Sequence, residues 1–227
     1  MTKSKKSSSL MSYAGTFGAL VILCVVLAIA SPNFFKYSNM MSVLKQTSFN
    51  ALVSTGMLLC LITAGIDLSV GANATFAACL AGMLVNKDMN NPVLLLVVAI
   101  VGGTLIGWIN GMLLTRLHLP HPFVSTLGMK NVLWGGALII TNSQMVSFSG
   151  NDAVMWLGSS TVAGFPVSFI VVLVIYVIMH ILLTKTALGR SIYCVGGNPE
   201  AARLSGINSA NVLTFCYTLS GFMAALA

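Results

Sequence analysis

The sequence contains very little charge, and almost none of it is negative. Charged residues make up 7% of the 227 positions, and four of them are acidic: Asp67, Asp88, Asp152 and Glu200. A soluble domain carries roughly a quarter of its residues as charged side chains. The hydrophobic share of 57% and the mean hydropathy of +0.94 agree with a lipid-facing surface. The chain is therefore predicted to be an all-α integral membrane protein.

The sequence signatures of common enzymes are missing as well. It contains no GxxxxGK[ST] motif for ATP, no HExxH pair for zinc, no GxSxG turn and no paired carboxylates. The cysteines show no CxxC or Cys/His spacing, so no metal site or disulfide is predicted at Cys24, Cys60, Cys79, Cys194 or Cys216. We expect a protein that is not an enzyme and that has no cofactor and no metal.

Long apolar runs dominate what is present. Each approaches or exceeds the ~17–25 residues that a spanning helix needs, the third being marginal. They lie at 13–30, 47–64, 70–85, 92–114, 123–141, 166–183 and 212–227. The prediction is a polytopic helix bundle with about seven spans in this chain. We expect a short cytoplasmic tail at 1–12 and a transmembrane domain over 13–227.

The basic residues indicate the orientation. The net charge is +7, but the Lys and Arg residues stand singly between apolar runs, which argues against nucleic-acid binding and for the excess of basic residues in cytoplasmic loops. With the N-terminus inside, the inner side receives Lys3, Lys5, Lys6, Arg116, Lys185, Arg190 and Arg203, and the outer side receives Lys36, Lys45 and Lys87. The outer stretch 142–165 has no Lys or Arg, as expected of an exported loop.

The two ends of the chain each allow two interpretations. The first apolar run is longer than the ~7–15 residues of a signal-peptide core, so we expect a retained helix rather than a cleaved secretory signal. The last run stops at Ala227 without a flanking charge or aromatic anchor, which favours a fragment of a longer chain over a short final helix.

One carboxylate interrupts the apolar region in GIDLSVG, residues 65–71. In one interpretation Gly65 ends a helix and Asp67 or Ser69 caps the next one. In the other, the segment is a broken helix that lines a substrate path through Asp67 and Ser69. Burying Asp67 unpaired costs ~2.5–3.5 kcal/mol, so both interpretations require a partner for it.

Other polar residues have simpler explanations. Asn110 lies on a stripe of small residues with Gly103 and Gly107, where we expect helix packing and a hydrogen bond across the interface. His118 and His121 could relay protons, but the sequence offers no second intramembrane acid at helical spacing, so hydrogen-bonded bystanders are the stronger interpretation.

Residues 196–206, GGNPEAARLSG, form a polar cassette between apolar stretches. Asn198 suits the N-cap, Pro199 the first helical position and Glu200 the positive end of the helix dipole. Arg203 complements the last turn, and Gly206 can take the left-handed conformation after it. A helix this short does not persist alone in water, so we expect a soluble partner to hold it.

Three motifs together resemble one family. GIDLSVG at 65–71, NGMLLTRLHLPHPFVSTLG at 110–128 and TALGRSIYCVGGNPEAARLSGI at 186–207 are similar to the permease subunits of bacterial sugar ABC importers of the ribose type. The match covers the chain, although His121-Pro122 stands where the family often has two prolines. The resemblance implies about ten helices in a full-length chain.

The resemblance also implies a cellular setting. It implies a bacterial inner-membrane protein that pairs with a second permease copy or a sibling, with two cytoplasmic ATPase subunits and with a periplasmic sugar-binding protein. Within a cytoplasmic loop at 184–211, it implies that the cassette is the coupling helix that docks on the ATPase, through Gly197, Asn198, Pro199, Glu200, Ala201, Ala202, Arg203 and Gly206. Asp67, Ser69 and Asn110 are the candidates for the translocation path.

Three alternatives stay open. An ion-coupled secondary transporter would need no ATPase, a membrane scaffold would move no substrate, and an ABC permease could carry a polyol or signalling molecule instead of a monosaccharide. The usual density of intramembrane charge that ion coupling employs is missing from the sequence.

Overall fold

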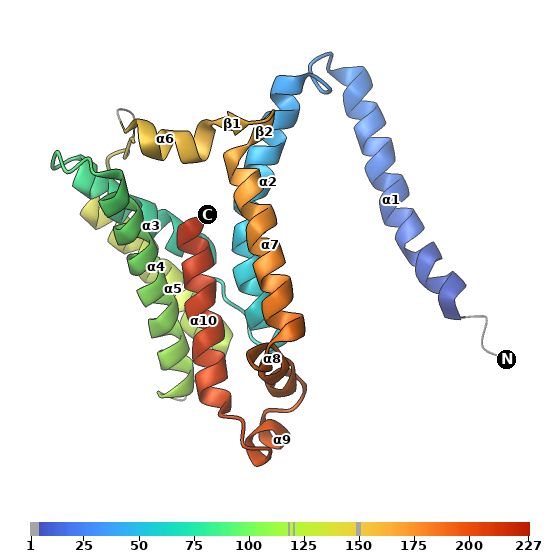
Figure 1. Ribbon diagram of the computed structural model, residues 1–227, viewed down its shortest axis with the longest axis vertical. Helices are drawn as coiled ribbons and strands as arrows, with labels where there is room; N and C mark the ends of the chain where they lie inside the picture. The colour runs from blue at the N-terminus through green and yellow to red at the C-terminus, as the bar shows by residue number, and fades with distance from the viewer. Residues whose placement is uncertain (1–4, 118, 120, 149–150) are drawn as a thin grey trace. The chain divides into compact units, whose positions relative to one another are not determined.

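The chain folds into helices joined by short connections. A computed structural model describes residues 5–117, 119, 121–148 and 151–227 (Figure 1). These residues form ten helices and one two-stranded hairpin, in two compact units over Met1–Leu44 (unit 1) and Lys45–Ala227 (unit 2). The expected helical architecture is confirmed, with the hairpin as a small addition.

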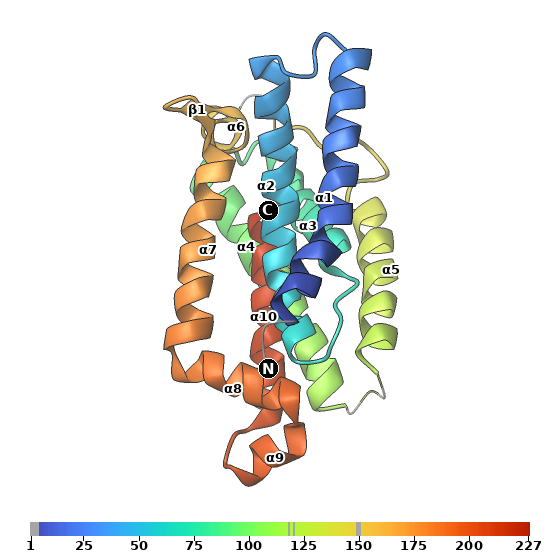
Figure 2. The same ribbon diagram turned by 90° about the vertical axis from the view of Figure 1, so that its right-hand side faces the viewer.

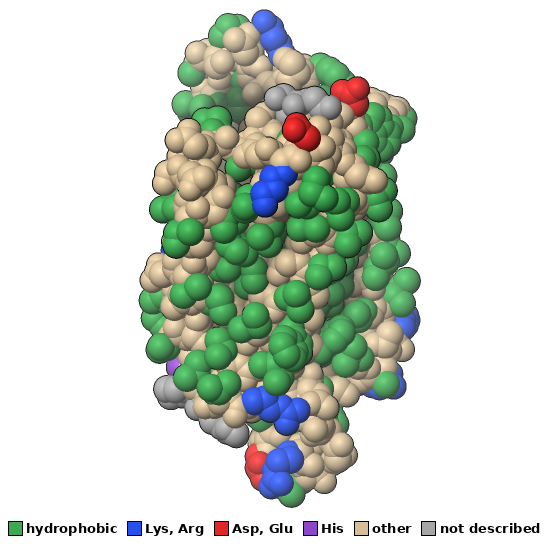
Figure 3. Space-filling model, turned by 90° about the vertical axis from the view of Figure 1, so that its left-hand side faces the viewer, with side chains coloured by type: hydrophobic (Ala, Val, Ile, Leu, Met, Phe, Trp, Pro, Cys, Tyr) green, Lys and Arg blue, Asp and Glu red, His purple; other side chains and the backbone are tan. Residues whose placement is uncertain are grey.

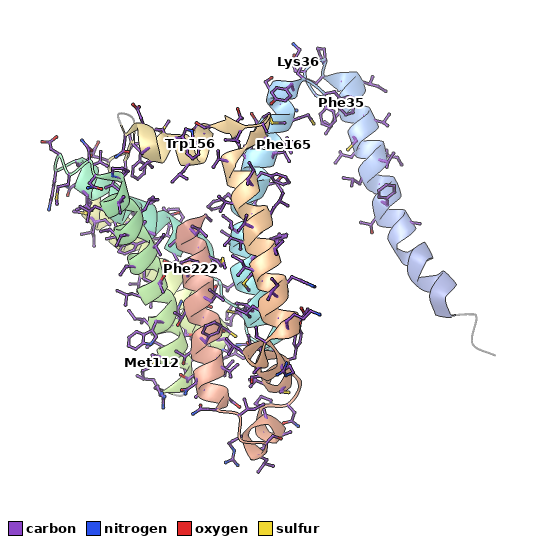
Figure 4. The ribbon with its side chains drawn as sticks, viewed as in Figure 1. Phe35, Lys36, Met112, Trp156, Phe165 and Phe222 are labelled. Atoms are coloured by element: carbon purple, nitrogen blue, oxygen red, sulfur yellow. The ribbon has the colours of Figure 1, made fainter. Side chains whose placement is uncertain are left out.

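Unit 1 holds helix α1 (Lys5–Ala30) and the beginning of α2 (Tyr37–Ile62). Apolar side chains such as Phe17 and Ile29 are exposed along α1, which suits a helix surrounded by lipid. In the turn that follows, the rings of Phe34 and Phe35 meet edge to face at 4.9 Å, and Phe35 and Lys36 mark this turn in Figure 4. Both helices begin earlier than the apolar runs predicted, because polar residues extend each helix at its N-terminal end.

Unit 2 holds the rest of α2 and all the later elements. The later elements are α3 (Val70–Val85), α4 (Pro92–Thr115), α5 (Pro122–Ile140), α6 (Asp152–Ser159), β1 (Thr161–Val162), β2 (Phe165–Pro166), α7 (Val167–Lys185), α8 (Ala187–Gly197), α9 (Pro199–Leu204) and α10 (Ser209–Leu226). The predicted spans at 70–85, 92–114, 123–141 and 166–183 match helices to within two residues.

Four of these helices, among the residues described, are long and apolar enough to cross a membrane: α4, α5, α7 and α10. Helix α3 is apolar but has 16 residues, and α2 has 26 residues with polar side chains in its first half. The helix positions fit a polytopic membrane protein, whereas length and hydropathy alone do not establish all seven expected spans.

Helix α10 lies at the centre of unit 2 and packs most extensively against α4 (Figure 2). The two backbones come close because glycines face each other. A Cβ on Gly107 would clash with the Tyr217 carbonyl oxygen, and one on Gly221 would clash with the Gly103 carbonyl oxygen. The small-residue stripe on α4 is thus a packing surface, as predicted.

The two ends of unit 2 differ in what they carry. We call the end with α9 and the start of α10 the α9 end, and the opposite end, with α6 and the hairpin, the α6 end (Figure 2). Figure 4 shows Trp156 of α6 and Phe165 of β2 at the α6 end, and Met112 of α4 toward the α9 end. On the face shown in Figure 3, hydrophobic side chains cover the middle and the visible acidic side chains lie toward the two ends.

Candidate functional site

The predicted cassette is a helix with a complete N-terminal cap. Asn198 has extended backbone angles, and its Oδ1 accepts hydrogen bonds of 3.0 Å from the backbone N–H groups of both Glu200 and Ala201. Pro199 occupies the first helical position, where no hydrogen-bond donor is required. Local contacts therefore cap the start of α9.

The C-terminal end of α9 is closed in the same local way. Gly206 has a φ of +83°, and its N–H donates to the Arg203 carbonyl oxygen at 3.0 Å, while the Ile207 N–H donates to the Ala202 carbonyl oxygen at 3.0 Å. These two bonds form a Schellman motif, in which glycine is favoured at the left-handed position. The expected left-handed conformation of Gly206 is confirmed, and the helix ends at Leu204.

An ion pair lies on the outer surface of this helix. Arg203 donates two hydrogen bonds to Glu200, at 2.6 Å and 3.0 Å, one turn apart. The hydrogen bonds from Arg203 hold the pKa of the Glu200 carboxyl below its usual value, and the pKa of Arg203 is raised by the same contact. Both side chains are largely exposed, so the pair orders the surface of α9 but adds little to stability.

Two apolar residues of α9 face opposite ways. Ala202 is 4% exposed and packs in a hydrophobic cluster with Ile192, Val195 and Val212, so it anchors the helix to unit 2. Leu204 is 76% exposed. Of the predicted coupling residues, Ala202 therefore points inward, whereas Gly197, Asn198, Pro199, Glu200, Ala201, Arg203 and Gly206 are exposed. Sequence reasoning did not single out Leu204, although a leucine in a polar cassette is the signal for it.

Helix α8 packs against α9 on the side of Ala202. This helix was not predicted from the sequence. The Thr186 hydroxyl accepts from the Gly189 N–H at 3.0 Å, and Ile192 and Val195 bury one face. A Cβ on Gly196 would clash with the Ile62 carbonyl oxygen, so α8 lies directly against the end of α2. The helical spacing of Leu188, Ile192 and Val195 was the sequence signal that could have revealed this helix.

A buried polar cluster surrounds Asp67, between α2 and α3. The Asp67 Oδ1 atom accepts from the Ser69 N–H at 3.0 Å and from the Ser69 hydroxyl at 2.6 Å, and its Oδ2 atom accepts from the Ser220 hydroxyl at 2.9 Å. Asn110 donates from Nδ2 to the Ser69 Oγ at 2.8 Å. The structure thus brings all three predicted pathway residues together, and the predicted need of Asp67 for a partner is confirmed.

The interpretation of this segment as a simple cap is wrong in its details. Helix α2 ends in a Schellman motif in which Ala64, with a φ of 57°, takes the left-handed position, and the Gly65 N–H donates to the Cys60 carbonyl oxygen at 2.8 Å. Gly65 is needed instead for space, since a Cβ there would lie 2.7 Å from the Tyr217 hydroxyl. Ser69 stands at the N-cap of α3 but makes no side-chain cap bond.

The cluster is closed in this conformation. Asp67 is 2% exposed, Ser69 0% and Asn110 1%, so none of the three presents a side chain to an open path. Two amide oxygens nearby, Oδ1 of Asn110 and Oδ1 of Asn73, are buried without a hydrogen-bond partner. Buried oxygens of this kind hold the capacity to accept further hydrogen bonds when the packing around them changes.

The histidines and the 142–165 loop complete the set of candidates. His121 caps α5, with Nδ1 accepting from the Phe123 N–H at 3.2 Å, which agrees with a bystander role; His118 lies outside the described residues. The loop contains α6, which is tied down at both ends. Asn151 donates to the Asn90 carbonyl oxygen at 2.7 Å, and the Lys45 ammonium donates to the Ser159 carbonyl oxygen at 2.6 Å.

Comparison with known proteins gives one consistent result. The family described as "Branched-chain amino acid transport system / permease component" matches residues 39–227. Similar proteins include the ribose import permease protein RbsC of Haemophilus influenzae, 34% identical over 93% of this chain and 66% of the relative, and that of Bacillus subtilis, 36% identical over 96% and 67%. The fructose import permease protein FruF of Bifidobacterium longum is 33% identical over 92% of this chain and 62% of its own length.

The chain spans about two thirds of the length of the curated relatives it matches, 66% of the Haemophilus influenzae protein and 67% of the Bacillus subtilis protein. No solved structure matches it.

Proposed function

Because the chain belongs to the family of branched-chain amino acid transport system permease components, we propose that it is the membrane-spanning subunit of an ATP-driven importer for a monosaccharide. Its role is translocation rather than catalysis, and ATP hydrolysis belongs to separate subunits. The sugar assignment is supported by relatives that are named as import permeases for ribose and fructose.

The observation that carries the proposal is the surface of α9. A six-residue helix is too short to be stable alone, yet this one is capped at both ends and anchored through Ala202. It exposes Leu204 beside the Glu200–Arg203 pair. An exposed leucine beside an ion pair offers an apolar contact with a polar edge, as protein interfaces do. We assign α9 as the coupling helix, and an ATPase subunit as the partner that covers Leu204.

The proposed orientation places the N-terminus and α9 in the cytoplasm of a bacterial cell and α6 outside the inner membrane. The excess of Lys and Arg on the inner loops supports it, with Arg116, Lys185 and Arg190 all close to the ends of helices at the α9 end.

We keep seven spans for this chain, with residues 1–12 as the tail, 13–227 as the transmembrane domain and 184–211 as the coupling loop. Leu204→Cys is introduced into a chain whose five native cysteines are replaced, because Cys194 is itself exposed. Attachment of a membrane-impermeant thiol reagent only in inverted vesicles would support this orientation, and attachment only in right-side-out vesicles would contradict it.

The remaining partners follow from the same proposal. A second copy of the chain or a sibling permease completes the pathway in the lipid bilayer, and a periplasmic sugar-binding protein docks on the 142–165 loop, where α6 is held by Asn151 and Lys45. Asp67, Ser69 and Asn110 stay the candidates for the pathway, opening only when the closed cluster rearranges.

The decisive experiment purifies the full-length chain from membranes and assays ATP hydrolysis in the eluate. We expect an ATPase to co-purify with the intact chain and to be lost when residues 198–206 are scrambled, or when Leu204→Ser or Glu200→Arg is introduced. Leu117→Ser, at an exposed leucine in the loop after α4, is the matched control. An intact chain that transports without any ATPase, and whose uptake collapses with an ionophore, would establish an ion-coupled carrier instead.

The substrate is tested on the same preparation. Uptake of labelled ribose, fructose and leucine into proteoliposomes that contain the co-purified complex, supplied with ATP and with the binding protein, separates a sugar importer from an amino-acid importer, which the family description also names. We expect uptake of a monosaccharide and none of leucine.

A further inference from the structure

Helix α10 contacts both α9 and the segment that carries Asp67. At its first residue, the Ser209 hydroxyl donates to the Pro199 carbonyl oxygen at 3.1 Å. Further along, the Tyr217 hydroxyl donates to the Ile66 carbonyl oxygen at 3.3 Å, and the Ser220 hydroxyl donates to Asp67 at 2.9 Å. Ser220 follows Ser209 by eleven positions along the helix, a rise of ~16 Å. One rigid element thus joins the surface helix to the buried cluster.

Residues 66 and 67 are held mainly by α10, through the hydrogen bonds from Tyr217 and Ser220, which we call the tether. Tyr217 and Ser220 lie three positions apart and therefore on one face of the helix. Two other side chains also bond to residues 66 and 67. The Thr126 hydroxyl donates to the Ile66 carbonyl oxygen at 3.4 Å, a longer contact than its 2.9 Å bond to the Pro122 carbonyl oxygen, and the Ser69 hydroxyl donates to Asp67 from within the same segment. Asn110 of α4 reaches Asp67 only through Ser69. Displacing α10 therefore displaces or breaks the Ser220 bond to the Asp67 carboxylate, whereas the two bonds from Ser69 stay within the segment.

Close glycine contacts hold α10 against α4 and α2 near Tyr217 and Ser220. A Cβ on Gly107 would clash with the Tyr217 backbone, and a Cβ on Gly56 would lie 2.9 Å from the Ser220 Cα. Contacts this close resist relative movement of the helices at these points, so we expect a shift of α10 at Ser209 to reach Tyr217 and Ser220. At the α9 end, Thr115 and Thr214 share a hydrogen bond of 3.0 Å between their hydroxyls.

The hydrophobic contacts that anchor α9 also involve α10. Ala202 packs in a cluster that includes Val212 and Cys216 of α10, five positions and one position before Tyr217. If a partner moves α9, the movement therefore acts on α10 through two contacts. One is the Ser209 hydroxyl, and the other is this hydrophobic cluster. The unpaired Oδ1 atoms of Asn73 and Asn110 lie in the buried region around the tether and offer acceptors for a rearranged packing.

From these contacts we propose that Tyr217 and Ser220 are positioning residues, which tie movement of α9 to the position of the Asp67 segment and so couple ATP hydrolysis to sugar movement. The inference rests on the proposed function and deepens it, since it names the joint between the coupling helix and the candidate pathway.

The test compares sugar uptake with ATP hydrolysis on the same reconstituted full complex. The variants are Tyr217→Phe, Ser220→Ala and the double variant, which remove hydroxyl groups without adding volume. The control is Thr218→Val, whose hydroxyl bonds only to the Thr214 carbonyl oxygen of its own helix. We expect the double variant to move ~10-fold less sugar per ATP hydrolysed, a typical size for a coupling between sites, with hydrolysis itself retained. The control should keep the wild-type ratio.

A purely structural role gives a different result. Loss of folded protein lowers uptake and hydrolysis together, so a double variant with the wild-type ratio overturns the inference. If the double variant does not insert, the two single variants carry the test, and a wild-type ratio in both overturns it. A wild-type complex that moves no sugar, or that moves it without ATP, overturns the proposed function and the inference with it.

A second measurement does not depend on transport. Hydrogen exchange of the amides at 63–69 in the purified full chain should be faster in the double variant than in Thr218→Val, because α10 then no longer holds this segment. Equal exchange in the two variants contradicts the tether.

Discussion

Ser220 of α10 donates a hydrogen bond of 2.9 Å to the carboxylate of Asp67, although 153 positions separate the two residues in the chain. The bond joins the last helix of unit 2 to the connection between α2 and α3. Asp67 accepts two further bonds from Ser69, so three donors share its two oxygens. A carboxylate in an apolar interior persists only with such a full set of partners.

Replacing Asp67 with Asn should reduce transport while leaving membrane insertion normal. The amide keeps the size of the side chain but offers one acceptor oxygen in place of two, so the bonds to Ser69 and Ser220 cannot all remain as they are. The measurement is uptake per inserted molecule, with the amount of protein in the membrane read from a blot. Unchanged uptake would remove Asp67 from the pathway and leave it as a structural residue.

The glycine contact between α4 and α10 should be sensitive to a single methyl group. Gly107→Ala should lower the free energy of unfolding by about 1–3 kcal/mol, the usual cost of overpacking a tight interface. Gly135→Ala in α5 is the control, because a Cβ there meets nothing within 4 Å. The two changes carry the same gain in helix propensity, so the difference between their thermal midpoints in detergent isolates the clash. Equal midpoints would mean that α10 can move away from α4 at no cost.

The N-cap of α9 should matter for partner binding. Asn198→Ala removes the acceptor for two N–H groups and should weaken α9 by about 1 kcal/mol, equivalent to about fivefold weaker capture of the ATPase. Asn91→Ala is a closely matched control, since Asn91 caps α4 with the same Asn-Pro pair and also accepts from two N–H groups, of Val93 and Leu94. The fraction of ATPase that co-purifies with each variant gives the answer. A similar loss with both variants would point to general instability instead.

The Glu200–Arg203 pair predicts a pH dependence with a definite sign. The pKa of Glu200 is lowered in the folded chain from its ordinary value of 4.5, so the pair is fully formed above that pH and is lost as pH falls through the lowered pKa. Capture of the ATPase should therefore not depend on the protonation of Glu200 between pH 7 and 4.5, and it should weaken as the pH falls below 4.5. In the Glu200→Gln variant, capture of the ATPase should no longer change with pH in this acidic range. A decline for wild type alone near neutral pH would contradict the assignment to Glu200.

Helix α6 should become mobile when the hydrogen bonds of Asn151 are removed. Asn151→Ala removes the bond to the Asn90 carbonyl oxygen together with the cap bond from the Val154 N–H, and we expect faster proteolysis within 142–165 in right-side-out vesicles. Asn208→Ala, which removes a comparable cap bond at the Asn211 N–H of α10, controls for a general loss of caps. If the proposed docking on this loop is right, stimulation of ATP hydrolysis by the binding protein should fall with Asn151→Ala.

The sequence by itself determined the features that depend on near neighbours. Composition and long apolar runs predicted a helical membrane protein because lipid forces backbone hydrogen bonds inside each segment. The caps of α9 were predicted correctly at Asn198, Pro199 and Gly206, since a helix end is satisfied by residues within three positions of it. Helix α8 was missed, although its own periodicity carried the signal.

Only the tertiary structure decided which distant groups meet. Asp67 required a partner, but nothing in the local sequence distinguished Ser220 from the other hydroxyl groups of the apolar helices. The small residues of α4 indicated a packing face, yet the choice of α10 as its partner came from the close contact of Gly107 with the Tyr217 backbone. Likewise, Ala202 and Leu204 are both apolar residues of α9, and their opposite exposures follow from where α8 and α10 pack. Such pairings depend on how whole helices fit together, a property of shape that one-dimensional spacing does not contain.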